Sequence, residues 1–351
     1  MNKADISRLF NNINNLKIGV IGDFFLDKYL IIDNKLDEPS IETKLMAHQV
    51  INTRQYPGAS GTICNNLAAL GIGDIYAVGF VGNDGNGFEL KKELDKIDIK
   101  RDYLFETDKM VTPTYIKPMM LRDGYEVESN RQDIKNFKNT DIEIENKIIN
   151  CLDEVFNICD GIIILDQMVE NNFGVITTKV REKLIELGNK YSDKIVFADS
   201  RARIKLFENI FIKCNDFEIC EAFNIKIDKK PNISDVFKCG IKMYEQNKKT
   251  IFVTMGKAGI IVFNKNGIYT IPTIKVEEPY DICGAGDSVT ATIVSLLTLG
   301  AKDEQAAFIG NIVASITIKK IGITGTANIT EVLKAYDDYF YNIEYVREKR
   351  K

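Results

Sequence analysis

The sequence predicts an α/β fold, a doubly wound and mostly parallel sheet with a small β-sheet lid. Short apolar runs typical of buried strands alternate with helical patterns over most of the 351 residues, and this alternation builds a parallel sheet. Several of these runs end directly before an Asp, Asn or Thr, as buried strands do where they meet a loop. Two segments break the alternation and favour a separate small sheet. We expect one domain over residues 1–351, with lid segments at about 29–57 and 112–133.

Each expected element follows from a local pattern. The run Lys-Ile-Gly-Val-Ile-Gly at 17–22 is apolar and ends in glycine before Asp23, which indicates a buried parallel strand. Similar runs predict the other strands, at 74–81, 161–165, 194–198, 211–214, 249–254 and 267–276. Helical patterns predict helices at 65–70, 87–96, 178–191 and 291–299, after a helix-like N-terminal stretch at 1–16.

The two lid segments differ in pattern. Residues 29–56 are expected to be extended and irregular, whereas residues 112–131 alternate like hairpin strands around Arg122-Asp123-Gly124, a turn signal. A small exposed β-sheet tends to pair with another copy to bury its apolar face. We therefore expect a homodimer formed through the lid.

The composition argues against several classes of protein. The net charge of −4 disfavours nucleic-acid and membrane-surface partners, and no apolar run approaches the ~20 residues that span a bilayer. With one histidine, His48, a multi-histidine zinc site cannot form and a Ser-His-Asp triad would depend on that residue. We expect His48 to be solvated or part of the lid. Seven scattered cysteines without a C-x-x-C pair are typical of a reducing cytoplasm.

Polar residues recur directly after the predicted strands. In open α/β sheets, ligands bind outside the carboxyl ends of the strands, so these side chains are expected to share one cleft. They are Asp23, Asp166, Asp199, Asn215 and Thr254.

The stretch 281–287, Asp-Ile-Cys-Gly-Ala-Gly-Asp, carries the strongest chemical signal. Its small residues stand where a helix begins, so the backbone N–H groups of Gly284, Ala285 and Gly286 are expected to hold an anion. Asp287 beside such a site is suited to accept the proton of a hydroxyl that attacks a phosphate. The alternative is an ordinary loop-to-helix junction in which Asp287 caps the helix.

Three further patterns suggest ligand contacts. Residues 56–62, which include Gly58, Ala59 and Thr62, are small enough for a polyhydroxylated ligand to lie against the backbone, although a tight turn would look the same. Asn215 and Glu218 can share one face of a helical turn and suit Mg²⁺ held through water, or form an N-cap pair. The stretch 254–259 suits nucleotide phosphates or ribose, or is a β-turn. There is no Walker motif, and the glycines at 79–87 do not open the first βαβ unit as a dinucleotide site requires.

Taken together, these residues resemble the ribokinase-like (PfkB) family of carbohydrate kinases over roughly 17–330. The Asp-x-x-Gly-Ala-Gly-Asp signature is complete at 281–287, and the first signature loop is met in part at 58–62. Within the family, the stretches 22–29, 38–40 and 66–71 look most like the heptose 7-phosphate kinase branch, the kinase half of a bifunctional enzyme. The His-x-Gly-His element of the other half cannot occur in a chain with one histidine, so we expect a kinase without it.

The resemblance implies a role for each position that matches the family. Asp287 would be the base, with Gly284, Ala285 and Gly286 as N–H donors to the transferring phosphoryl group. ATP with Mg²⁺ would lie near Glu218 and Asn215, and a monovalent cation, K⁺, near Asp281. The nucleotide would also contact Thr254, Gly256, Lys257, Gly259 and Asn311. The sugar or sugar phosphate would contact Asp23, Asp27, Gly58, Ala59, Thr62, Arg131 and Asp166, with Arg131 as a clamp for a phosphate already on the substrate.

Three departures from the family pattern leave the substrate open. Ala59 stands in place of a second glycine, Thr62 in place of an asparagine, and Leu165-Asp166-Gln167 in place of Ser-Asp-Tyr. The phosphoryl-transfer half of the pattern is intact and the sugar-reading half is altered. A kinase of a nucleoside or another non-sugar alcohol, and a catalytically silent binding protein, therefore remain alternatives to the sugar kinase.

Overall fold

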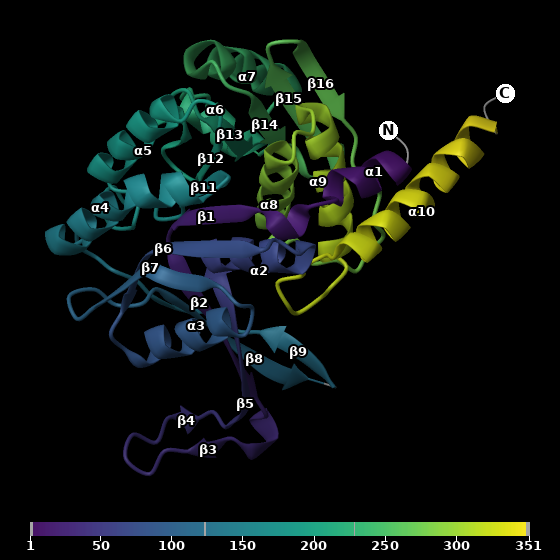
Figure 1. The fold of residues 1–351 in the computed structure, drawn as a ribbon. Helices are drawn as coiled ribbons and strands as arrows, with labels where there is room; N and C mark the ends of the chain where they lie inside the picture. The colour runs from purple at the N-terminus through teal and green to yellow at the C-terminus, as the bar shows by residue number, and fades with distance from the viewer. Residues whose placement is uncertain (1–2, 123, 228, 349–351) are drawn as a thin grey trace.

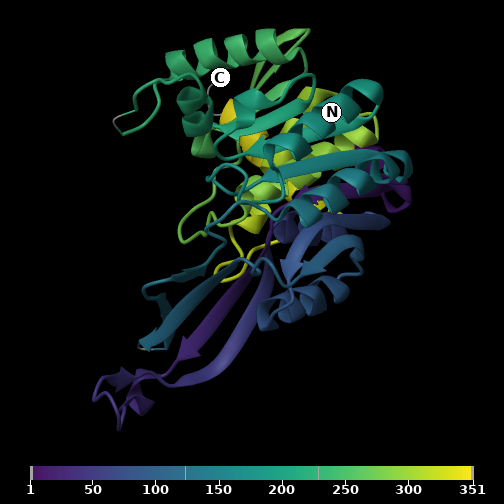
Figure 2. The same ribbon diagram turned by 90° about the vertical axis from the view of Figure 1, so that its left-hand side faces the viewer.

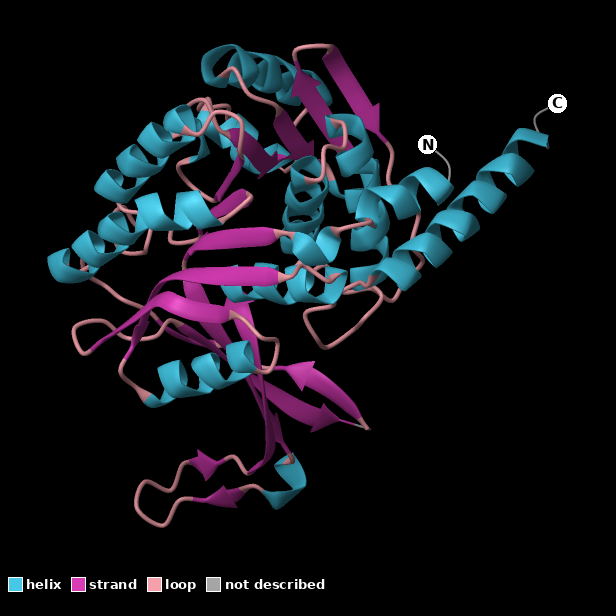
Figure 3. Ribbon diagram, in the orientation of Figure 1, coloured by secondary structure: helices cyan, strands magenta, loops and turns pink. Residues whose placement is uncertain are grey.

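The computed structural model describes residues 3–122, 124–227 and 229–348, and it places most strands in one nine-stranded sheet (Figures 1 and 3). All neighbouring strands from β14 to β7 run parallel, while β15 and β16 are antiparallel at one edge. The order is β16 (Gly267–Ile271), β15 (Ile260–Asn264), β14 (Ile251–Thr254), β13 (Phe211–Asn215), β12 (Ile195–Ser200), β11 (Gly161–Asp166), β1 (Lys17–Gly22), β6 (Asp74–Gly82) and β7 (Lys100–Thr107). The predicted fold class is confirmed.

The apolar runs of the sequence form the buried strands of this sheet. All seven strands predicted for it are present within a few residues, although β16 ends at Ile271 rather than at 276. Two strands of the sheet, β7 and β15, were not predicted. Strand β15 is buried along its whole length, but only one 3-10 turn, η4 (Gly256–Ala258), separates it from β14. The sequence therefore indicated the strand at 249–254 and a turn after it, but not the second strand.

Helices cover both faces of the sheet (Figure 1). One face packs against α1 (Lys3–Phe10), α2 (Ser60–Leu70), α8 (Ala285–Thr298), α9 (Asp303–Thr317) and α10 (Ile329–Glu348), and the other against α4 (Ile142–Ile158), α5 (Thr178–Lys190), α6 (Asp216–Ala222) and α7 (Ile233–Asn247). Two apolar cores result, one on each side, as a doubly wound fold requires. In the part of the chain that the structure describes, no helix is long and apolar enough to cross a bilayer.

A second, smaller sheet forms the lid and projects from the body (Figure 2). It consists of β5 (Val50–Ala59), β2 (Phe24–Ile32), β8 (Thr114–Arg122), β9 (Tyr125–Glu128) and β10 (Gln132–Ile134), with α3 (Gly85–Asp95) packed nearby. The hairpin predicted at 112–131 is confirmed as β8 and β9, although position 123 of its turn lies outside the described residues.

Residues 29–56 are extended as expected, but they are irregular mainly at 33–49, and the two ends of the segment belong to regular strands. Strands β2 and β5 pair in register from Phe24 opposite Ala59 to Ile31 opposite Asn52. Packing between the two strands makes them regular, although neither segment shows a clear alternation of apolar and polar residues. Between them, β3 (Glu38–Pro39) and β4 (Met46–Ala47) form a small arm that begins with the 3-10 turn η2 (Asn34–Leu36). His48 lies in this arm, exposed, with Nδ1 2.7 Å from Asp37 Oδ2.

The strand order brings the predicted polar edge together. Strands β1, β11, β12, β13 and β14 are consecutive neighbours and parallel, so the residues at their carboxyl ends lie along one edge of the sheet. These are Asp23, Asp166, Asp199, Asn215 and Thr254. The N-terminal half of α8 belongs to the same region, because the hydroxyl of Thr290, in its second turn, donates to Asp199 Oδ2 at 3.1 Å.

Candidate active site

A cavity of about 550 Å³ opens at this edge, within the size range of small-molecule sites. Ala285 and Gly286 line it at the start of α8. Asn311 is fixed in its wall by donating to the carbonyls of Ile271 and Pro272 at 3.1 and 3.2 Å. Five of the residues predicted to contact a nucleotide line this one cavity: Thr254, Gly256, Lys257, Gly259 and Asn311.

The backbone before α8 is shaped by Gly284. Its φ is 73°, and a Cβ there would lie 2.5 Å from Thr324 Cγ2, so only glycine fits without a shift. Of the three predicted N–H donors, Ala285 is already engaged, because its N–H donates to the Ile282 carbonyl at 3.1 Å. Among the described residues, the N–H groups of Gly286 and Asp287 have no such partner. The N–H groups at this helix start that can bind a ligand therefore lie one residue later than predicted, and the anion site itself stays a prediction.

Asp287 is distinguished from the other carboxylates of this edge by the lack of a hydrogen-bonding partner within the described residues. It lies in the first turn of α8, partly buried. Burial raises its pKa to about 7, helped by Asp199 and Asp27 and opposed by the positive charges of Lys213 and Arg201. A carboxyl group with this pKa exchanges a proton readily near neutral pH, as a general base must.

Two buried lysines were not anticipated. Lys213, in β13, places Nζ 2.6 Å from Asp199 Oδ2. Lys117, in β8 of the lid, lies 3.6 Å from Asp27 Oδ1 and donates to the Tyr29 hydroxyl at 3.0 Å. The sequence does contain a sign of such a residue, namely a lysine inside an otherwise apolar strand. A lysine is rarely buried there unless its charge is paired.

Asn215 and Glu218 form the N-cap pair that the sequence analysis held as the alternative. Asn215 Oδ1 accepts from the Glu218 N–H, and Glu218 Oε2 accepts from the Asn215 N–H, both at 2.8 Å, which is a capping box at the start of α6. No group of three or more metal-ligating side chains occurs among the described residues. Glu218 Oε1 has no protein donor in that part of the chain, and the magnesium held through water that was expected here stays a prediction.

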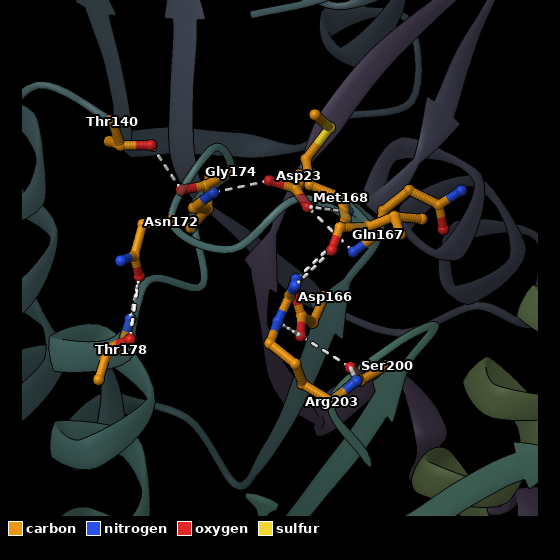
Figure 4. Close-up of polar contacts among 12 residues, drawn as sticks. Asp23, Thr140, Asp166, Gln167, Met168, Asn172, Gly174, Thr178, Ser200 and Arg203 are labelled. Carbon is orange, nitrogen blue, oxygen red and sulfur yellow. Dashed lines mark hydrogen bonds and ion pairs between the residues drawn. The ribbon is translucent and has the colours of Figure 1, made fainter. Parts of the chain in front are cut away.

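Asp23 and Asp166 are not among the residues that line this cavity. Both are engaged by the protein itself (Figure 4). Both oxygens of Asp23 accept backbone N–H groups, from Gln167, Met168 and Val175 at 2.7 to 3.1 Å. Burial raises the pKa of Asp23 to about 6 despite these bonds.

Asp166 is paired with Arg203. Its Oδ2 accepts hydrogen bonds from Arg203 Nε at 3.0 Å and from the Ser200 hydroxyl at 2.7 Å. Arg203 Nη1 donates to the Val169 carbonyl at 2.8 Å, and Nη2 donates to the Met168 carbonyl. The sugar contacts expected of Asp23 and Asp166 stay predictions. Both carboxylates hold the loop that follows β11, because their hydrogen-bonding capacity is used within the fold.

Asp27 and Gly58 meet across the lid sheet. A Cβ on Gly58 would lie 3.1 Å from Asp27 Oδ2, so the glycine leaves room for this carboxylate. Asp27 is buried; burial raises its pKa, and the neighbouring Lys117 counteracts the effect. Thr62 is buried too, but its hydroxyl donates to the Pro57 carbonyl at 3.2 Å, which turns it toward the protein.

Arg131 and Asp281 already have partners within their own segments. The Arg131 guanidinium forms two hydrogen bonds with Asp133, at 2.7 and 3.0 Å, and lies 4.3 Å above the Tyr115 ring. Asp281 Oδ1 accepts the Cys283 N–H at 2.9 Å and so supports the loop before α8. The phosphate clamp and the monovalent-cation site expected at these residues stay predictions.

Ala59 adopts a backbone conformation that favours glycine. Its φ of 52° and ψ of −117° lie at the junction of β5 and α2, where the family pattern has glycine. Such a conformation costs an ordinary residue about 1–3 kcal/mol, whereas glycine loses roughly 0.5–1 kcal/mol in chain entropy.

We expect Ala59→Gly to raise the free energy of unfolding by about 1 kcal/mol, measured by urea denaturation. Ala68→Gly, in the regular part of α2, is the matched control and should lower it by about 1 kcal/mol. A similar loss in both variants would show that Ala59 is not strained.

Proteins of similar sequence are known. The sequence matches the family described as pfkB family carbohydrate kinase over residues 26–330. It is 27% identical to bifunctional protein HldE of a Nitratiruptor species over 318 residues, 90% of this chain and 64% of that protein. It is 28% identical to bifunctional protein HldE of Helicobacter hepaticus over 338 residues, 95% of this chain and 66% of that protein. The chain spans about two thirds of the length of these relatives.

Solved structures share the fold. Phosphofructokinase-2 from Escherichia coli in complex with potassium superposes with a TM-score of 0.70 and 18% identity, covering 92% of this chain and 99% of that one. Ribokinase of Arabidopsis thaliana, complexed with ribose and ATP, gives a TM-score of 0.67 and 16% identity, covering 91% and 98%. With the family match over most of the chain, these findings lead to one conclusion. The chain belongs to the pfkB family of carbohydrate kinases.

Proposed function

We propose that this protein transfers the terminal phosphoryl group of ATP to a hydroxyl of a sugar phosphate, with Asp287 as the base. The observation that carries the proposal is Asp287, a carboxylate without a hydrogen-bonding partner in the described residues, which directly follows Gly286 in the lining of the 550 Å³ cavity. The other strand-end carboxylates of the edge, Asp23, Asp166 and Asp199, are each occupied by protein donors.

The proposed reaction follows from these positions. The substrate hydroxyl attacks the terminal phosphorus, its proton passes to the Asp287 carboxylate, and the bond from phosphorus to the bridging oxygen breaks to leave ADP. The unpaired N–H groups of Gly286 and Asp287, at the positive end of α8, would bind the oxygens of the group in transfer. A magnesium ion bound with ATP would neutralise phosphate charge, and Glu218 is suited to hold its water.

The lid supports an anionic substrate. Lys117 and Arg131 both lie close enough to oppose the rise in the pKa of Asp27, so they supply positive charge around it. Asp133 uses two of the five N–H donors of Arg131. The relatives reported above are named bifunctional protein HldE, and the stretches 22–29, 38–40 and 66–71 resemble the heptose 7-phosphate kinase branch. Heptose 7-phosphate is therefore the first candidate substrate.

The test is ATP consumption with heptose, hexose and pentose phosphates, the corresponding free sugars, and nucleosides. We expect turnover with a sugar phosphate and a large loss of kcat/KM with its free sugar. Turnover with nucleosides alone would replace the proposed substrate class. Tight ATP binding without transfer to any acceptor would contradict the kinase function and favour the silent binding protein.

We also propose a homodimer formed through the lid. The arm at 34–51 exposes large apolar side chains that the monomer leaves uncovered: Leu36, Ile41, Leu45, Met46, Val50 and Ile51. Such a patch is typical of an interface.

Ile41→Asp combined with Leu45→Asp is expected to convert a dimer into a monomer in light scattering, because two charges would be buried in the interface. Ile268→Asp, on the exposed edge strand β16, is the control that should stay dimeric. A wild-type monomer at micromolar concentration would contradict the dimer.

A further inference from the structure

Lys213 is buried at the carboxyl end of β13, with 7% of its surface exposed. Asp199 Oδ2 accepts from its Nζ at 2.6 Å and also accepts the Thr290 hydroxyl at 3.1 Å. An ammonium group has three N–H donors, and Asp199 is the only hydrogen-bonding partner of Nζ among the described residues. Two donors of a buried cation are therefore left for something the protein does not supply, and leaving them unmade is costly.

The place of this ammonium group is defined by Gly286. A Cβ on Gly286 would lie 3.1 Å from Lys213 Nζ, so the lysine approaches the backbone that also lines the nucleotide cavity. Glu218 and Asp287 are close enough to raise the pKa of Lys213 together with Asp199. The ammonium group thus lies among three carboxylates and next to Gly286, which lines the cavity.

We propose that Lys213 binds the phosphoryl group during its transfer, and that Asp199 and Thr290 position the ammonium group for this contact. The inference rests on the proposed phosphotransferase function and adds a residue to it. As the phosphorus–oxygen bond to ADP breaks, negative charge spreads over the oxygens of the group in transfer, and a fixed cation at this point stabilises it. Glycine at 286 matters for the same reason, since a side chain there would displace Nζ.

If the Lys213–Asp199 ion pair only stabilised the fold, removing it would affect the binding of ATP and of adenosine to the same extent. Replacing Lys213 with methionine should weaken binding of ATP at least tenfold by calorimetry while leaving the affinity for adenosine, which has no phosphate, unchanged. The value of kcat should fall by about 10²–10³, the effect of removing one donor to a transition-state anion. Lys213→Gln is the second variant, and retained adenosine binding shows that either one is folded.

The pH profile provides an independent measurement. Lys213 lowers the pKa of Asp287 and Asp199 raises it. Lys213→Met should therefore move the acidic limb of the kcat/KM profile to higher pH, and Asp199→Asn should move it to lower pH. The charged and titratable groups that face Asp287 are Lys213, Asp199, Arg201, Asp27 and Cys283.

Lys194→Met is the matched control. Lys194 Nζ donates to the carbonyls of Phe156 and Cys159, both at 2.6 Å, on the face of the sheet covered by α4. This variant should lose stability and keep its affinity for ATP. If Lys213→Met and Lys213→Gln keep kcat and ATP affinity within twofold of an active wild type, the role of Lys213 is overturned while the kinase function stands. If the wild type transfers no phosphate, the function fails, and the comparison of ATP with adenosine still tests Lys213.

Discussion

Asp287→Asn is expected to lower kcat by about 10²–10⁴ while ATP binding is kept or strengthened. The amide cannot accept the proton of the attacking hydroxyl, so the chemical step loses its base. Binding should not suffer, because the carboxylate repels the phosphates that the start of α8 attracts. Rapid-quench assays give the rate of transfer and calorimetry gives the affinity for ATP.

Asp303→Asn is the matched control for this variant. Asp303 also lies in the first turn of a helix, α9, but it accepts hydrogen bonds from Thr250 and Asn264, both at 2.8 Å, away from the cavity. This variant should lose stability and keep kcat. If Asp287→Asn turned over substrate as fast as the wild type, Asp287 would not be the base.

The pH dependence of the wild type follows from the same carboxyl group. With a pKa raised to about 7, Asp287 is protonated at lower pH and cannot act as a base. The value of kcat/KM should therefore fall about tenfold per pH unit below about 7 and level off above it, since this parameter reports the free enzyme. In Asp287→Asn this limb should disappear from the residual activity. A wild-type profile that stays flat from pH 5 to 8 would contradict the assignment.

The sequence was sufficient for the features that depend on local pattern. Apolar runs that end in Asp, Asn or Thr located the edge of the sheet, and the stretch 281–287 located the start of α8. Both depend on neighbouring residues, so a single chain carries the signal. The apolar pattern of α8 is recognisable only from residue 291, six residues after the helix begins, so the small residues at 284–286 are what marked its start.

The roles of the individual carboxylates could not be predicted in the same way. Asp23 and Asp287 each directly follow a glycine. Asp23 accepts N–H groups from residues 144 and more positions further along the chain, whereas Asp287 has no such donor among the described residues. Asp166 meets Arg203, 37 positions away, only because β11 and β12 are neighbours. Whether a carboxylate serves the fold or a ligand is decided by such distant partners.

The Asp166–Arg203 pair is expected to dominate the stability of the active-site edge. Arg203 is 9% exposed, and its donors bind Asp166 and the carbonyls of Met168 and Val169. From the opposite side, Asp23 holds the same loop (Figure 4). The loop after β11 is thus fixed between two buried charged groups.

Arg203→Met should lower the free energy of unfolding by about 3–5 kcal/mol, because among the described residues it leaves the buried Asp166 carboxylate with the Ser200 hydroxyl as its one hydrogen-bond donor. Arg101→Met is the matched control: Arg101 makes two hydrogen bonds to Asp95, at 2.6 and 2.9 Å, on the surface, where an ion pair contributes less than about 1 kcal/mol. Adding Asp166→Asn to Arg203→Met should recover part of the loss, since it removes the unpaired charge. Equal losses in the two arginine variants, measured by urea denaturation, would show that burial adds nothing to the Arg203 pair.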